Sequence, residues 1–424
     1  YPHAMLIARV KRVISSALVI GLATFIAPAN SAAIAGTKCT KVGATKTVSN
    51  IKYTCVKQGS KIIWNKGVTI VPVVKPTPTP RPSQMATPTP SPTSSPTQEQ
   101  NSNPKPSPTP TVTPFEIPSQ PTSFSNLLQN ISGIPYSAWV KSHDKILKSQ
   151  SVLGKTNILI GPNTRPDNSD PLVAMNLVSR LFSEYTQPKE VQLMYASDLD
   201  IDWGQNQINS FCGATDCGYN TGGEAKKACN IPVTPCWGAF AARNQKTGIP
   251  LMYQTASDWG KTDLNHIQGT LEAHEYFHTV QDIAVQQAGN GRMPRWLVEG
   301  SASWVQPAAV FYKDYDFYMS ERNRVAGYIL KQKYSASFLE DYLNPSTGLD
   351  WSSWDKYQDN FGFYDIGLLA TEVMASVGGP NSVLALFKRV GDGQTFQEAF
   401  QSEFGISWNQ GVKIIAEVIS KESQ

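Results

Sequence analysis

Residues 269–284 read GTLEAHEYFHTVQDIA, and they contain two of the five histidines in a chain of 424 residues. Positions four apart lie on one face of an α-helix, so His274 and His278 can direct their imidazole nitrogens at one point. Glu275 lies about 100° around the helix from His274, where it can reach a metal-bound water without being a ligand. The stretch therefore predicts a helix that carries a metal site with an adjacent carboxylate base.

A second stretch, WLVEGSA, supplies the ligand that the histidine pair lacks. Zinc in a hydrolytic site takes three protein ligands and keeps one position open. Glu299 lies 21 residues after His278 and is flanked by tryptophans, which would seat its helix against the first one. A glutamate buried among apolar groups needs a cation, so this context favours a metal ligand over a solvated surface carboxylate. A third ligand at this distance also makes an accidental histidine pair the less favoured interpretation. The sequence predicts one Zn²⁺ held by His274, His278 and Glu299.

Taken together, HEYFH and WLVEGSA resemble the gluzincin metallopeptidases, and the W-L-x-E-G-x-A form is most similar to the branch with the M1-like peptidases. The resemblance covers residues 270–305 and extends more weakly to about residue 410. It implies that the two histidines and Glu299 bind zinc and that Glu275 is the general base. The M1-like pattern also places an oxyanion-binding tyrosine at about the position of Tyr364. A purely structural aromatic residue is the alternative there, and His266 is a second candidate for this electrophile.

Two elements of that family are missing. No G-x-M-E-N motif precedes the predicted zinc helix, which argues against simple aminopeptidase activity. Position 303 is serine, so the thermolysin-like E-x-x-x-D arrangement is absent, and the group that orients the ligand histidines is not identified.

The resemblance implies metal-assisted hydrolysis of a peptide bond in a protein or peptide substrate, with Glu275 as the base. Two other functions stay open. One is a surface-binding or adhesion protein built on a degenerate peptidase domain. The other is a zinc amidase that acts on cell-wall material.

Because the net charge is only +4 and the basic residues are scattered, the sequence lacks the basic patch that is typical of a nucleic-acid-binding protein. We expect a monomer.

The N-terminus carries the pattern of an export signal. Lys11 and Arg12 precede the apolar run VISSALVIGLATFIA, so residues 1–33 are predicted to be a signal peptide of a secreted chain. An uncleaved membrane anchor is the alternative, because the run is only a few residues short of a membrane span.

The six cysteines are expected to form disulfides, because export brings the chain into an oxidising compartment. For the four between Cys212 and Cys236, a zinc site is the alternative, although they contain no C-x-x-C pair.

Three segments follow the signal. Residues 34–70 contain short alternating runs between Gly and Ser, which predict a small β module stapled by Cys39 and Cys55. The module resembles those near the N-termini of exported actinobacterial proteins, where it would serve as a spacer or bind the cell wall or cell surface. Residues 71–121 hold 16 of the 30 prolines and predict a Pro/Thr/Ser-rich stalk. Residues 122–424 are the predicted catalytic domain.

Within this domain, strands come first and helices follow, which predicts an α+β fold. We expect a small mixed or antiparallel sheet packed on one side by a helical subdomain, with the zinc site on its active-site helix, as in zincin-like folds. GIPLMYQTAS is predicted to be the edge strand that supports an extended peptide. The predicted strands are TNILIGP (156–162), EVQLMYAS (190–197), WGAFAARN (237–244) and GIPLMYQTAS (248–257), and the first two flank a helix over 170–185.

Overall fold

The computed structural model of the chain contains two compact units, Tyr1–Ser107 and Pro108–Gln424. The predicted signal peptide lies outside the described residues, and so does most of the predicted stalk. The last residues of the stalk, 115–121, belong to the larger unit, because the ring of Phe115 lies 5.7 Å from that of Tyr136. The described residues are 38–41, 44–48, 51–58, 61–64, 68–69, 115–168, 170–213, 216–217, 223–229, 236, 238–256, 264–285, 292–344 and 362–423.

The smaller unit contains one antiparallel sheet. Strand β2 pairs with each of the other three strands, and the order is β1-β2-β3 with β4 also on β2. The predicted disulfide between Cys39 and Cys55 is confirmed, and Cys55 is completely buried. The cross-link therefore holds the start of the module against its longest strand. The strands are β1 (Thr45–Val48), β2 (Ile51–Gln58), β3 (Lys61–Trp64) and β4 (Val68–Thr69).

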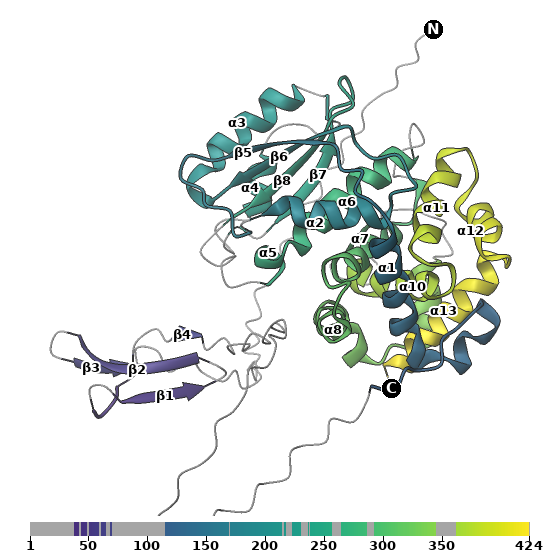
Figure 1. Cartoon of the computed structure of the whole chain (residues 1–424), viewed down its shortest axis with the longest axis horizontal. Coiled ribbons are helices and arrows are strands. Elements are labelled where there is room, and N and C mark those ends of the chain that lie inside the picture. The colour runs from purple at the N-terminus through teal and green to yellow at the C-terminus, as the bar shows by residue number, and fades with distance from the viewer. Residues whose placement is uncertain are drawn as a thin grey trace, which may run out of the picture. The chain divides into compact units, whose positions relative to one another are not determined.

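The larger unit contains a four-stranded mixed sheet in the order β5-β6-β8-β7 (Figure 1). Strands β5, β6 and β8 run parallel, whereas β7 pairs antiparallel with β8 through a short turn. With the helices around it, the sheet confirms the predicted α+β class. The strands are β5 (Lys155–Ile160), β6 (Glu190–Ala196), β7 (Ala239–Arg243) and β8 (Pro250–Thr255).

Helices cover both faces of this sheet, so the prediction of packing on one side is wrong. On one face, Leu193 and Met252 pack into the core formed with α2 and α6. On the other face, Met194 and Leu251 pack against Ile208 of α3. Strands buried on both faces read as continuous apolar runs, which is why LMYA in β6 does not alternate.

The prediction of the edge strand is also wrong. Strand β8, which contains most of GIPLMYQTAS, lies between β6 and β7 and is buried along its whole length. Strand β7 is an edge of the sheet order, and all its residues are half-buried. The two strands form a hairpin, and the sequence pattern of a hairpin does not show which arm pairs with a distant third strand.

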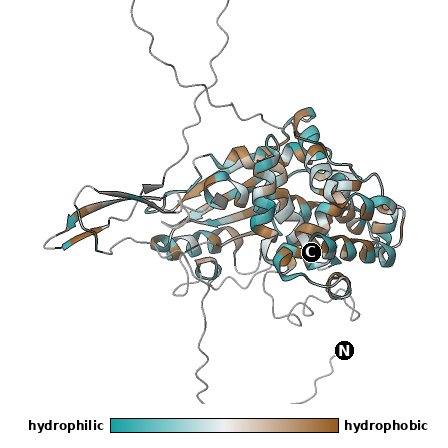
Figure 2. Cartoon of the chain, turned by 90° about the horizontal axis from the view of Figure 1, so that it is seen from below, coloured by the Kyte–Doolittle hydropathy of each residue, from teal (hydrophilic) through white to brown (hydrophobic). Residues whose placement is uncertain are grey.

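The rest of the unit is helical (Figure 1). Individual helices carry hydrophobic and hydrophilic residues side by side, as expected of helices that bury one face (Figure 2). Among the described residues, no helix has the length and apolar character needed to span a bilayer. The helices are α1 (Ile134–Lys148), α2 (Pro171–Leu181), α3 (Ile201–Cys212), α4 (Glu224–Cys229), α5 (Leu264–Gln268), α6 (Thr270–Val285), α7 (Arg295–Val310), α8 (Tyr315–Gln332), α9 (Ala336–Leu343), α10 (Gly362–Gly378), α11 (Pro380–Gly391), α12 (Phe396–Phe404) and α13 (Trp408–Glu422), with 3-10 turns η1 (Phe124–Gln129), η2 (Ile131–Gly133) and η3 (Asp198–Asp200).

Two disulfides lie beside the sheet, so the four later cysteines are cross-linked, as predicted. Cys212 bonds to Cys217 and Cys229 bonds to Cys236. Cys212 ends α3 and Cys229 ends α4, so each bond fixes the end of one of the two helices on that face. Each disulfide closes only a short loop, of 5 and 7 residues in sequence separation. A short loop loses little conformational entropy in the unfolded chain, so the bonds hold the local geometry of these helix ends more than they stabilise the whole fold.

Helices α7 and α10 cross in close contact at two glycines. A Cβ atom on Gly300 would lie 2.2 Å from the Cα of Gly367, a distance at which one of the helices must move. Gly300 directly follows Glu299, and Gly367 comes three residues after Tyr364. The glycines therefore set the position of two predicted site residues.

A cluster of buried charges ties α8, α10 and α13 together. Arg322 Nη2 lies 2.6 Å from Glu372 Oε2 and 2.8 Å from Glu422 Oε2. The hydroxyl of Tyr318 donates a hydrogen bond to the other oxygen of Glu372. We refer to Arg322, Glu372, Glu422 and Tyr318 as the core charge cluster. Its contacts join the C-terminal helix to the helix that carries Tyr364.

Candidate functional site

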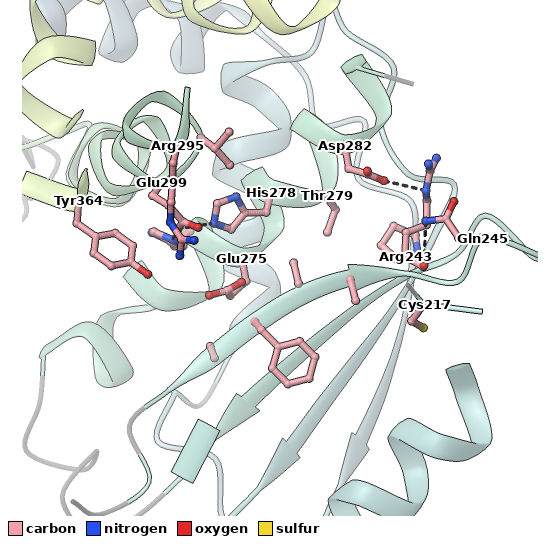
Figure 3. A pocket seen from close by; sticks show the side chains of 17 residues that line it. Cys217, Arg243, Gln245, Glu275, His278, Thr279, Asp282, Arg295, Glu299 and Tyr364 are labelled. Atoms are coloured by element: carbon pink, nitrogen blue, oxygen red, sulfur yellow. Dashed lines mark hydrogen bonds and ion pairs between the residues drawn. The ribbon is translucent and has the colours of Figure 1, made fainter. Parts of the chain in front are cut away.

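Helices α6 and α7 bring the three predicted zinc ligands together. Nε2 of His274 lies 3.6 Å and Nε2 of His278 lies 3.3 Å from Oε2 of Glu299. One ligand atom from each residue lies within 4.8 Å of the other two. Figure 3 shows His278 and Glu299 facing each other from the two helices. The spacing of the histidines on one helix face therefore produces the convergence that the sequence predicts.

The start of α6 depends on one glycine of the opening stretch. Gly269 has φ +82°, in the left-handed region that a residue with a side chain rarely adopts. It separates the short helix α5 from α6. The chain can therefore change direction just before the helix that carries both histidines.

The donor set and its dimensions fit a zinc ion. Two imidazole nitrogens and one carboxylate oxygen are ligands that catalytic zinc takes, and they leave a fourth position open. Ligand atoms about 2.1 Å from an ion at tetrahedral angles are about 3.4 Å from one another. The two distances to Glu299, 3.6 and 3.3 Å, are close to this value. The residues present fit the metal in chemistry, and the two distances to Glu299 fit it in spacing.

Gln281 is a residue of this site that the sequence reasoning missed. Its side-chain nitrogen donates hydrogen bonds to the carbonyl of Val298 and to Oγ of Ser301, both at 2.9 Å. Its side-chain oxygen therefore faces Nδ1 of His278, at 2.7 Å. That oxygen can only accept, so Nδ1 carries a proton, and Nε2 is the nitrogen that can offer a lone pair to the metal position once it has lost its own proton. The sequence does carry a signal for this contact, because in HEYFHTVQ the amide of Gln281 comes three residues after His278 and so lies on the same side of the helix.

Glu275 is buried, and its side chain lines the same cavity as the ligands. Burial raises the pKa of its carboxyl to about 7, and the charge of Glu299 adds to the effect while His278 opposes it. A carboxylate with a pKa near the working pH can both take and return a proton. The geometry therefore places a suitable base beside the three ligands.

In the metal-free protein, the three ligands differ in protonation. Burial opposes a charge on His278, but the Glu299 carboxylate outweighs it and raises the pKa of His278 to about 9. Burial lowers the pKa of His274 below its ordinary value. Although burial favours its neutral form, the nearby histidines hold the pKa of Glu299 well below the usual range. These directions favour the ionised form of Glu299 and the protonated form of His278, so a metal bound here would have to displace the proton of His278.

Tyr364 lies in the cavity, as the resemblance implies. It comes from the first turn of α10, and its ring centroid is 6.0 Å from that of His274. Burial and the nearby carboxylates raise the pKa of its hydroxyl above the ordinary value, so the hydroxyl keeps its proton. The group can therefore donate a hydrogen bond. The other candidate, His266, lies in α5, where Nδ1 is 3.4 Å from Oδ2 of Asp167, and it does not line the cavity.

The site opens into a cavity of ≈ 820 Å³ between β7 and helices α6 and α7. All five residues of β7 line it, together with Glu275 and the three ligands. Arg243 of β7 forms an ion pair with Asp282 of α6, with Nε 2.8 Å from Oδ2 (Figure 3). A cavity of this size accommodates several residues of an extended chain.

Comparisons with known proteins found no matching family model, no similar curated protein and no similar solved structure. The functional argument therefore rests on the chemistry and geometry of the site.

Proposed function

We propose that the chain is a secreted zinc-dependent metallopeptidase of the gluzincin type, which hydrolyses peptide bonds. The observation that carries the proposal is the convergence of His274, His278 and Glu299, at distances suited to a tetrahedral ion, beside the buried base Glu275. Three cross-linked cysteine pairs support an extracellular location. The cavity along β7 favours a protein or peptide substrate.

Zinc bound here would make water a stronger acid and polarise the carbonyl of the bond to be cut. Glu275 takes the proton of the attacking water and passes it to the leaving amine. The hydroxyl of Tyr364 donates a hydrogen bond to the oxygen on which negative charge develops. Gln281 holds the ring of His278 in the orientation that directs Nε2 into the site.

The proposal is tested by zinc analysis and by hydrolysis of an unfolded protein substrate. We expect about one zinc per chain in the purified protein. His274→Ala should lose both the zinc and the activity, whereas Glu275→Gln should keep the zinc and lose activity by about a hundredfold to ten-thousandfold. A protein that binds zinc but does not cleave would support the adhesion alternative. Cleavage of peptidoglycan fragments, and not of protein, would support the amidase. Full activity in Glu275→Gln would contradict the mechanism.

A further inference from the structure

An arginine lies at one end of the cavity, away from the zinc ligands. Arg243 is the last residue of β7, and its guanidinium pairs with Asp282 of α6. Figure 3 shows this pair across Thr279 from His278 and Glu299, on the opposite side from Tyr364. The side chains of Arg243 and Asp282 are each 24% exposed, so the pair is accessible from the cavity.

Helix geometry sets the distance between this pair and the metal position. Asp282 comes four residues after His278 and eight after His274, which corresponds to about 6 and 12 Å along α6. An extended peptide advances about 3.3 Å per residue. A substrate with its cut bond at the zinc ligands would therefore have its second to fourth residue beyond that bond near Arg243.

The charges at this end favour a negative group. Within the ranges that the structure describes, Asp282 is the one ionic partner of Arg243 and contacts its Nε, and no partner of the two terminal nitrogens is found. An arginine stays protonated at any accessible pH and can bind a carboxylate through two parallel hydrogen bonds. Asp282 already faces a cation, and burial raises its pKa despite Arg243. A basic group of the substrate would therefore have to compete with Arg243 for the carboxylate of Asp282.

We propose that Arg243 is a specificity-determining residue that binds a carboxylate of the substrate, about two to four residues from the bond that is cut. The inference rests on the proposed function, since the distance is counted from the zinc site. The carboxylate belongs either to the C-terminus of the peptide or to an aspartate or glutamate side chain. In the first case, the protein removes short peptides from the C-terminal end. In the second case, it cuts within chains near acidic residues.

The test measures peptide binding to the full chain that carries Glu275→Gln, loaded with zinc, because this protein holds the peptide without cutting it. The probes are alanine-rich octapeptides with an N-terminal fluorophore, followed by fluorescence anisotropy. One pair has a free or an amidated C-terminus. A second, amidated series carries a single Glu, or the matched Gln, at each position. We expect a free terminus or a Glu at one or two positions to lower the dissociation constant about tenfold. The peptide pair that shows the difference identifies the source of the carboxylate.

The Arg243→Gln variant should bind carboxylate and amide peptides equally, while Arg165→Gln, at an exposed arginine outside the cavity, should keep the preference. If Arg243→Gln does not fold, Arg243→Lys keeps the charge but not the two parallel bonds and should reduce the preference severalfold. Two results would overturn the inference. One is a folded Arg243→Gln variant that still prefers carboxylate peptides to the full extent. The other is a protein with Arg243 in place that shows no such preference.

Hydrolysis by the unmodified protein separates this inference from the proposed function. Cleavage of the octapeptides with no dependence on Arg243 would refute the inference alone. Binding that depends on Arg243 without any cleavage would refute the proposed peptidase and leave a carboxylate-binding site.

Discussion

The core charge cluster and the zinc-ligand group are each made of buried and half-buried side chains, but only the first is complete without an added ion. In the core charge cluster, Arg322 bonds to two glutamates, and Tyr318 bonds to the free oxygen of one of them. In the zinc-ligand group, two imidazole nitrogens face one carboxylate oxygen, and Nδ1 of His274 has no hydrogen-bond partner among the described residues. A buried charge with every partner present serves the fold, whereas a group that needs a cation marks a site for one.

Glu372→Gln tests the structural side of this comparison and should give the largest effect. The glutamine amide replaces one of the two oxygens that accept from Arg322 and Tyr318, so a buried charge-assisted hydrogen bond is lost and a buried donor is left facing another donor, which together cost about 3–5 kcal/mol of stability. Denaturant unfolding of the metal-free protein measures this loss. Zinc content per folded chain should stay unchanged. A loss of zinc from folded protein would show that the two groups are coupled.

Tyr364→Phe tests the functional side. Loss of the hydroxyl should reduce kcat by about a hundredfold to a thousandfold, because a donor to the developing oxyanion is removed, while zinc content and KM change little. Steady-state kinetics on a cleaved peptide provide the measurement. If kcat is unchanged, Tyr364 has a packing role only, as the alternative in the sequence analysis holds.

Gln281→Met removes the acceptor that faces Nδ1 of His278 and should weaken zinc binding by about tenfold to a hundredfold. Gln281→Glu keeps an acceptor oxygen for Nδ1 but loses the donor to the Val298 carbonyl, so it should restore part of the affinity. Competition with a chromophoric chelator gives the affinity, and the melting temperature of the metal-free proteins shows whether the fold is intact. Equal zinc affinities in the three proteins would assign Gln281 to packing between α6 and α7.

The pH dependence of zinc binding gives the smallest change per step, about tenfold for each pH unit. The pKa of His278 is raised to about 9 in the metal-free protein, so below that pH zinc must displace a proton. The dissociation constant should rise about tenfold for each pH unit below about 9 and level off above it. In Glu299→Gln the sloping region should move to lower pH, because the charge that raises the pKa is gone. A flat profile between pH 7 and 9 in the unmodified protein would contradict this assignment.

The sequence predicted the convergence of His274, His278 and Glu299 better than the order of the sheet, because the two signals differ in range. His274 and His278 are four residues apart on one helix, so local geometry fixes their relation, and Glu299 lies on the next helix. The edge strand depends on a pairing between β6 and β8 that is distant in sequence. Helices α3 and α4 are not among the predicted elements, because the segment between EVQLMYAS and WGAFAARN is rich in polar residues and cysteine. Gln281 was missed because a side-chain amide is not among the carboxylates and backbone carbonyls that usually orient a ligand histidine.

The crossing at Gly300 and Gly367 has a consequence for how this protein can vary. Neither glycine has a side chain that could take part in a reaction. Gly300 nevertheless directly follows Glu299, and Gly367 lies less than one helical turn after Tyr364. A single added methyl group would push the two helices apart and move the ligand and the tyrosine together. Even an alanine at either glycine should therefore disturb the candidate site as much as a change in one of the site residues, although neither glycine contributes a side chain to it.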